Sequence, residues 1–253
     1  MSFLITVFLV MARVSGLIIS MPLFNSKLIP NTVKSVLILL ITAVLAPVIP
    51  YEERTLGLGV LLLGISSEFM LGVLMGGAIM LVFTCISVAS QMISAQIGQA
   101  AAMQFNPTMG MTTSPVGSIS TMLALSVFLG TNGHLELLTL LAASFEPVPL
   151  EQVVNPFAGA QLWVDYSLNV FFVGLRMAGP VLTLVLLINT FIAILSKIAP
   201  TMNMFFSVGF IITMFVGMLL FIFMIPNILV VVNNLIEQAI RDLPRLFELV
   251  RRE

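Results

Sequence analysis

Three ionisable side chains sit inside long apolar stretches of this sequence, where a charge is costly and usually functional. They are Arg13, Glu68 and Arg176. Such residues serve either as a proton relay or as buried ion pairs and contacts with a partner protein. A relay needs several carboxylates and histidines that face one another, and only the carboxylate of Glu68 lies deep in an apolar stretch. We therefore expect buried charges that pair, with Glu68 bound to an arginine or to a partner subunit.

Patterns for catalysis or metal binding do not appear elsewhere in the sequence. The single histidine, His134, follows an Asn-Gly turn signal, and the single cysteine, Cys85, lies in an apolar stretch. Neither belongs to a cluster with metal-ligand spacing, and there is no paired carboxylate, Ser/His/Asp set or glycine-rich phosphate loop. We expect no enzyme activity, no cofactor and no metal.

A long stretch between Glu68 and Glu136 has no Lys, Arg, Asp or Glu, yet its middle is not apolar. Residues 84–118 are rich in Ser, Gln, Gly and Met and contain Asn-Pro and Ser-Pro breaks. A backbone opened by Pro and Gly is tolerated at membrane depth only where protein buries it or where it lines a watery path. This pattern favours the lining of a conduit.

Residues 106–118 form a neutral loop that carries methionine but no aromatic residue and no charge. Methionine is flexible and adapts to irregular partners. We interpret the loop as a plug that closes a path to small ions and yields to a passing chain; an ordinary exposed connection is the alternative. The plug candidates are Asn106, Pro107, Met109, Gly110, Met111, Ser114 and Pro115.

Two faces are expected on the helix that leads to this loop. The pore-lining candidates Met92, Gln96, Gln99 and Met103 recur at spacings that share one face of a helix. The small residues Ser90, Ser94 and Gly98 form a neighbouring ridge for close helix packing. In the alternative interpretation, both faces serve only to pack a helical bundle.

Close packing of helices is also indicated by a GxxxG pattern, Gly72 to Gly76, in an apolar helix. The pattern is a weak signal when it stands alone, because glycine is frequent in such helices.

The elements that position these residues are long apolar helices. Six apolar runs each approach or exceed the roughly 20 residues that cross a bilayer: 3–24, 33–50, 56–86, 119–143, 167–195 and 204–232. We expect the first run to be a retained span, because its only charge, Arg13, lies inside it. The last two runs form a helical hairpin, followed by a basic tail over 233–253.

Composition agrees with a multi-span membrane protein. The mean hydropathy is +1.16, 59% of residues are hydrophobic and 8% are charged, against about a quarter charged in soluble domains. The net charge of −1 argues against nucleic acid as a partner. If all six runs cross, Lys27, Lys34 and Lys197 lie on one side, and Arg54 with the four tail arginines lies on the other. This bias is too small to orient the chain.

Several short stretches stand out along the chain: Arg13-Val-Ser-Gly-Leu-Ile-Ile-Ser-Met-Pro-Leu-Phe, Ile29-Pro30, Leu45-Ala46-Pro47, Glu68-Phe-Met-Leu-Gly-Val-Leu-Met-Gly76, Gln96-Ile-Gly98, Asn106-Pro107, Asn132-Gly133-His134 and Ile198-Ala-Pro200. Together they resemble the FliR/SctT family of type III secretion export-gate proteins. Their order and spacing extend over nearly the whole chain. No single one is a strict motif.

The resemblance implies an export gate in the bacterial inner membrane at the base of the flagellum. It implies a hetero-oligomer with FliP and FliQ homologues, surrounded by FlhA and FlhB homologues, through which unfolded export substrates pass. It also implies that 1–162 is FliP-like, with the plug at 106–118, and that 163–253 is a FliQ-like hairpin. The sequence has Asn-Pro at Asn106 where many family members have Asp-Pro, which leaves no carboxylate there.

The sequence therefore predicts an all-α, membrane-type protein of about six long hydrophobic helices that acts as a subunit of an export gate. Three alternatives stay open. One is a secondary transporter of a small neutral solute, with 106–118 as a broken-helix site, although the two halves show no internal repeat. The second is a gate of the injectisome instead of the flagellum. The third is a scaffold that only nucleates the other subunits.

Overall fold

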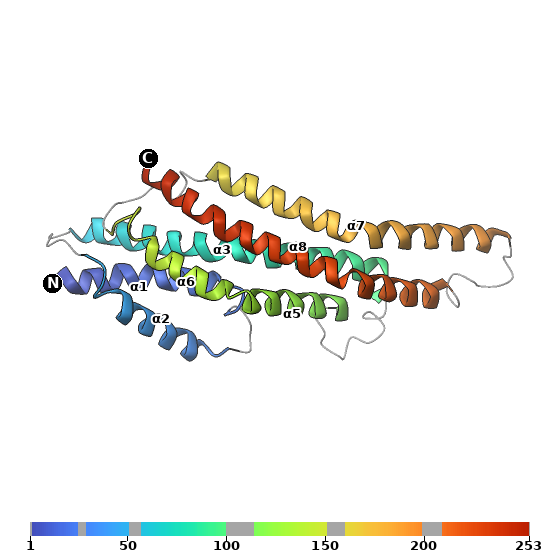
Figure 1. Ribbon diagram of the computed structural model, residues 1–253, viewed down its shortest axis with the longest axis horizontal. Helices are drawn as coiled ribbons and strands as arrows, with labels where there is room; N and C mark the ends of the chain where they lie inside the picture. The colour runs from blue at the N-terminus through green and yellow to red at the C-terminus, as the bar shows by residue number, and fades with distance from the viewer. Residues whose placement is uncertain are drawn as a thin grey trace. The chain divides into compact units, whose positions relative to one another are not determined.

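The structure is a computed structural model. It describes residues 2–24, 29–50, 57–99, 114–150, 160–198 and 209–252. All regular structure in these residues is helical, which confirms the all-α prediction (Figure 1). The helices are α1 (Ser2–Ser20), α2 (Asn31–Leu45), α3 (Leu58–Gln96), α5 (Pro115–Gly130), α6 (Gly133–Ala143), α7 (Ala160–Ile198) and α8 (Phe210–Arg252).

Four of the described helices are long and apolar enough to cross a membrane, namely α1, α3, α7 and α8. The pair α5 and α6 makes a fifth span only if a bend of 59° between them lies within one crossing. Helix α2 has 15 residues, or about 22 Å at a rise of about 1.5 Å per residue, which is short of a bilayer core of about 30 Å. The expectation of about six long hydrophobic helices is thus confirmed in kind, with four or five of span length and the shorter apolar α2 among the described residues.

Two boundaries differ from those expected. The apolar run 119–143 breaks at Asn132, whose backbone is left-handed with φ of 59°. Asparagine tolerates that conformation and glycine follows it, so the turn signal outweighs the apolar pattern. At the other end of the chain, α8 continues to Arg252 without the separate tail that was expected after residue 232.

The chain divides into two compact units that each draw on separate stretches of sequence. Unit 1 comprises Met1–Val82, Phe128–Leu168 and Leu235–Glu253, and unit 2 comprises Phe83–Val127 and Asn169–Asn234. The likeness of 1–162 to FliP and of 163–253 to FliQ concerns other subunits and stays a prediction.

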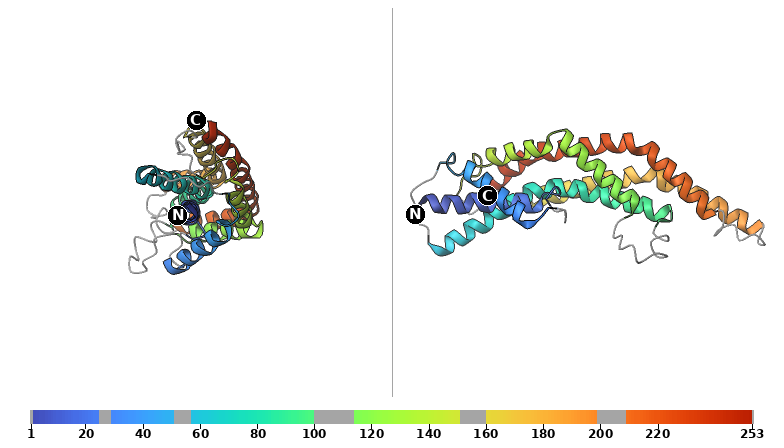
Figure 2. Two further views of the ribbon diagram at one scale, coloured as in Figure 1. Left: turned by 90° about the vertical axis from the view of Figure 1, so that its left-hand side faces the viewer. Right: turned by 90° about the horizontal axis from the view of Figure 1, so that it is seen from below.

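In unit 1, α1 and α3 pack against each other in parallel (Figure 2). Gly64 of α3 faces Leu9 of α1, and Gly76, further along α3, faces Leu17 and Ser20. Contacts therefore advance in the same direction along both helices. Because the two helices are parallel, the stretch that contains α2 must return the chain to the start of α3.

Unit 2 contains an antiparallel pairing between α7 and α8. The hydroxyl of Thr213 on α8 donates to the side-chain carbonyl of Asn189 on α7 at 3.0 Å. The last turns of α3 pack on both helices: the Cys85 thiol donates to the carbonyl of Val170 at 2.9 Å, and Gly217 faces Ile97. The end of α3 is thus held by two helices that are far from it in sequence.

Candidate functional site

Among the described residues of unit 1, the guanidinium of Arg13 makes the most polar contacts, and it is only 1% exposed. Its Nε lies 2.5 Å from Oε2 of Glu68. Its two terminal nitrogens donate to the hydroxyl of Ser144 at 2.9 Å and to the carbonyl of Val148 at 3.0 Å. The ring of Phe145 lies below the guanidinium, with its centroid 4.1 Å from Cζ. One side chain on α1 thus joins α3 to the turn that follows α6.

Because the cluster is buried, its charges and hydrogen-bonding groups must find their partners within the protein. Glu68 is 1% exposed, and Ser144 and Val148 are fully buried. Removing two charges from water costs several kcal/mol per ion, so a buried pair stabilises only with good geometry and further hydrogen bonds. The planar donor fork of arginine supplies those bonds in three directions. Oε1 of Glu68 accepts no hydrogen bond among the described residues, so Arg13 is the sole ionic support of that carboxylate there.

The GxxxG pattern lies at the contact between α1 and α3. A Cβ atom on Gly72 would overlap the carbonyl oxygen of Arg13, and one on Gly76 would overlap the hydroxyl of Ser20. On α1, a Cβ on Gly16 would likewise overlap the carbonyl of Phe69. Glycine on both helices lets the two backbones approach closely, as in other small-residue interfaces of membrane helices. Because Gly72 is one turn beyond Glu68, the close approach also brings Glu68 within reach of Arg13.

The predicted pore-lining stripe is interrupted where α3 ends at Gln96. Gly98 has a φ of +89°, a conformation that glycine adopts without strain and that commonly ends helices. Met92 is exposed and Gln96 half-exposed, but Gln99 is buried, with a side-chain oxygen that accepts no hydrogen bond from a described residue. The expectation that Gln99 continues the stripe assumed that one helix runs through residues 92–103. In the structure α3 ends at Gln96, and the backbone turns at Gly98. Met103 lies outside the described residues.

The small-residue ridge contacts the start of α5 and the start of α8. The hydroxyls of Ser94 and Ser114 share a hydrogen bond of 2.5 Å, and Gly117 lies close to Ser90. At the far end of the ridge, the ring of Phe210 faces Gly98. All of these contacts lie in unit 2.

Two plug candidates, Ser114 and Pro115, lie in the described part of the chain and begin α5. The Ser114 hydroxyl accepts the backbone N–H of Gly117 at 3.1 Å, three residues on, which is the geometry of a helix N-cap. Pro115 fills the first helical position, where proline is favoured because its missing N–H is not needed. Asn106, Pro107, Met109, Gly110 and Met111 lie outside the described residues.

Replacing Ser114 by alanine removes both the cap and the hydrogen bond to Ser94. We expect Ser114→Ala to lower the free energy of unfolding by about 1–2 kcal/mol, of which the cap contributes about 1. Thermal denaturation of the full chain in mild detergent would measure this loss. Ser126→Ala is the matched control, because the Ser126 hydroxyl is exposed and bonds only within its own helix, to Met122. An equal effect of the two substitutions would contradict the anchoring role of Ser114.

Arg176 differs from the other two ionisable candidates. It is exposed on α7, and no described residue forms an ion pair with it. Its expected burial is therefore not seen within this chain, and pairing with a partner subunit stays a prediction.

Sequence reasoning missed the third side of the Arg13 cluster. Ser144, Phe145 and Val148 follow an apolar run and carry no pattern that links them to α1. Their contact with Arg13 is made by the turn directly after α6, 131 residues or more from Arg13 in sequence. A serine and an aromatic residue directly after a predicted span are too common to have indicated this role.

The fold and the buried cluster together define a helical, membrane-type protein in which the charges of Arg13 and Glu68 serve internal packing. The family described as bacterial export proteins, family 1, matches residues 4–239 of this sequence. The chain belongs to this family.

Curated relatives agree with this assignment. The flagellar biosynthetic protein FliR of Pectobacterium carotovorum subsp. carotovorum is 36% identical over 220 residues, which cover 85% of this chain and 82% of the relative. FliR of Escherichia coli (strain K12) is 29% identical over 240 residues, covering 92% and 91%. The Yop proteins translocation protein T of Yersinia pestis is 30% identical over 149 residues, covering 57% and 56%. The predicted resemblance to the FliR/SctT family is confirmed.

Proposed function

We propose that this chain is a subunit of a type III secretion export gate that passes unfolded flagellar proteins across the bacterial inner membrane. The observation that carries the proposal is the length of the similarity: relatives named flagellar biosynthetic protein FliR match this chain over 85% and 92% of its residues. The similarity to the Yersinia translocation protein covers 57% of the chain, which supports the flagellar assignment over the injectisome.

In the proposed role the chain joins FliP and FliQ homologues at the base of the flagellum, beside FlhA and FlhB homologues. Gating, not catalysis, is its task. The helices of 39 and 43 residues, α3, α7 and α8, extend to about 60 Å at about 1.5 Å per residue. That is about twice the bilayer core, so protein partners are needed to cover the apolar surface that lipid cannot reach.

The gating element in this proposal is the neutral loop 106–118. Its methionines close the path to small ions and move aside for a polypeptide. The N-cap at Ser114 and its bond to Ser94 support the proposal, because they fix the point from which such a loop departs. Energy for transport must come from the partners.

Deleting Met109–Thr113 tests the plug while leaving Ser114 to cap α5. We expect the assembled gate to conduct small ions at least tenfold better than the parent gate, measured in planar bilayers. The matched control replaces Met109 and Met111 by leucine, which preserves loop length and bulk and should leave the gate closed. An unchanged conductance in a gate that still assembles would contradict the plug.

The proposed function as a whole is tested by assembly. The tagged chain is co-expressed with FliP and FliQ from the same genome, purified in mild detergent and weighed as an intact complex. A discrete complex that contains all three subunits is the expected result. A stable lone monomer that takes up a small neutral solute in vesicles would instead establish the transporter alternative.

A further inference from the structure

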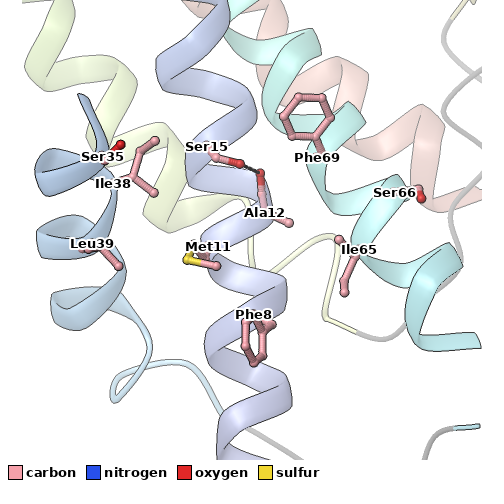
Figure 3. A pocket seen from close by; sticks show the side chains of 10 residues that line it. All are labelled: Phe8, Met11, Ala12, Ser15, Ser35, Ile38, Leu39, Ile65, Ser66 and Phe69. Carbon is pink, nitrogen blue, oxygen red and sulfur yellow. Dashed lines mark hydrogen bonds between the residues drawn. The ribbon is translucent and has the colours of Figure 1, made fainter. Parts of the chain in front are cut away.

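An open apolar groove of about 670 Å³ lies between α1, α2 and α3, within unit 1 (Figure 3). Its size is in the range of about 300–1,000 Å³ that small ligands occupy. Phe8 and Met11 of α1, Ile38 and Leu39 of α2, and Ile65 and Phe69 of α3 supply most of its surface. Phe8, Leu39 and Phe69 are 51%, 58% and 38% exposed, so no part of the described chain covers the groove.

The serine hydroxyls that line the groove already donate hydrogen bonds to backbone carbonyls of their own helices. The hydroxyl of Ser15 donates to the carbonyl of Ala12 at 2.8 Å, a bond that Figure 3 shows. Ser35 donates to Asn31 at 3.0 Å, and Ser66 donates to Leu62 at 2.8 Å. A polar ligand would lose its bonds to water here and gain no donor in return, whereas hydrocarbon loses nothing. The groove therefore suits an alkyl chain.

A lysine of α2 directly precedes the groove residue Ser35. Lys34 is four residues before Ile38 on α2, so the two side chains share a face, with Lys34 one turn nearer the start of the helix. Lys34 is half-buried on this face, and no carboxylate in the described residues pairs with it. An alkyl slot next to an unneutralised lysine complements an anionic amphiphile.

The surroundings of α2 favour lipid over protein as the occupant. The face of α2 that points away from the groove is also apolar, with Leu40 and Val44 exposed by 58% and 70%. A helix that is apolar on both sides stands in hydrocarbon.

We propose that the groove between α1, α2 and α3 binds one acyl chain of an anionic phospholipid, whose phosphate lies against Lys34. This lipid completes the wall of unit 1 and supports the short helix α2 on the side that does not pack against α1. The inference does not depend on the proposed role in export.

Photo-crosslinking tests the site in the full chain. The protein is placed in nanodiscs that contain phosphatidylcholine and phosphatidylglycerol, one of which carries a diazirine in its acyl chain, and the labelled residues are mapped by mass spectrometry. We expect labels to concentrate on the groove residues Met11, Ile38 and Ile65. Ile38→Trp should fill the groove and reduce this labelling at least fivefold, whereas Val44→Trp, on the opposite face of α2, should not.

The headgroup contact is tested separately with Lys34→Gln. A lysine near an anionic lipid surface contributes about 1 kcal/mol, so groove labelling by phosphatidylglycerol relative to phosphatidylcholine should fall about fivefold. Lys197→Gln removes the same charge from the exposed end of α7 and should leave the ratio unchanged. The same ratio in Lys34→Gln and in the parent chain would overturn the anionic contact.

Two further outcomes would overturn the proposal. The first is labelling that is as strong around Val44 as in the groove, which would show ordinary contact with bulk lipid. The second is loss of groove labelling when the chain is purified with its partner subunits, which would show that protein covers the groove in the assembly.

Discussion

Arg13→Ala is expected to lower the free energy of unfolding of the chain by about 3–5 kcal/mol, which is the usual cost of breaking a buried ion pair by removing one partner. The substitution leaves the carboxylate of Glu68 buried at 1% exposure without a counter-ion. It also removes the donors to Ser144 and Val148. Thermal denaturation in mild detergent and the yield of monodisperse protein would measure the loss.

The conservative variant Arg13→Lys separates charge from geometry. An ammonium group keeps the positive charge but cannot direct three donors to Glu68, Ser144 and Val148 at once. We expect Arg13→Lys to recover less than half of the stability lost in Arg13→Ala. Full recovery would mean that only the charge matters and that the bonds to the turn after α6 contribute little.

The double variant Arg13→Leu/Glu68→Leu tests whether the charges themselves are needed. Apolar replacement of both partners of a buried pair is often neutral, because neither charge is then left without compensation. We expect the double variant to be more stable than either single leucine variant, which a double-mutant cycle would detect as strong coupling. Additive single effects would contradict direct pairing.

Arg176→Ala is the matched control for these variants, since Arg176 also lies in an apolar helix but is exposed and has no described ion-pair partner. We expect a change within about 0.5 kcal/mol in the isolated chain. An effect of Arg176→Ala on assembly with partner subunits would locate its role there, without touching the prediction for Arg13.

Much of the fold could be predicted from the sequence, because apolar runs define membrane helices strongly. That Glu68 meets an arginine could also be expected, since a lone carboxylate in an apolar helix needs a counter-ion. The sequence could not predict which of the two arginines pairs with Glu68. Arg13 is selected over Arg176 by the parallel packing of α1 on α3, and parallel packing depends on the path of the short α2 between them.

The errors came from single residues that override a periodic pattern. Gly98 follows the end of α3, which was expected to continue, and Asn132 divides a run that reads as one helix. In both places the backbone adopts a left-handed conformation, which costs glycine nothing and asparagine little. Hydrophobic periodicity does not indicate where the backbone adopts a positive φ. In such chains, helix boundaries are therefore best predicted first from glycine and Asn-Gly positions.

Gly72→Ala and Gly59→Ala are expected to change stability in opposite directions, although both place a methyl group on the same helix, α3. A Cβ on Gly59 meets nothing within 4 Å, and alanine is favoured over glycine in a helix by about 1 kcal/mol. A Cβ on Gly72 overlaps the backbone carbonyl of Arg13. Neither backbone can move aside as a flexible side chain would, so α1 must shift as a whole. We expect Gly72→Ala to lose about 3 kcal/mol, at the upper end of overpacking costs.

The same shift should act on the ion pair one turn away. Glu68 and Gly72 lie on one face of α3, so a displaced α1 carries Arg13 away from a contact of 2.5 Å. We therefore expect Gly72→Ala to add little further loss in a chain that already carries Arg13→Ala, because both changes remove the same interaction. Thermal denaturation of the two single variants and the double variant in mild detergent would measure this coupling. Fully additive losses would show that the glycine crossing and the ion pair stabilise unit 1 independently, whereas a stabilising Gly72→Ala would contradict the close approach of the two backbones.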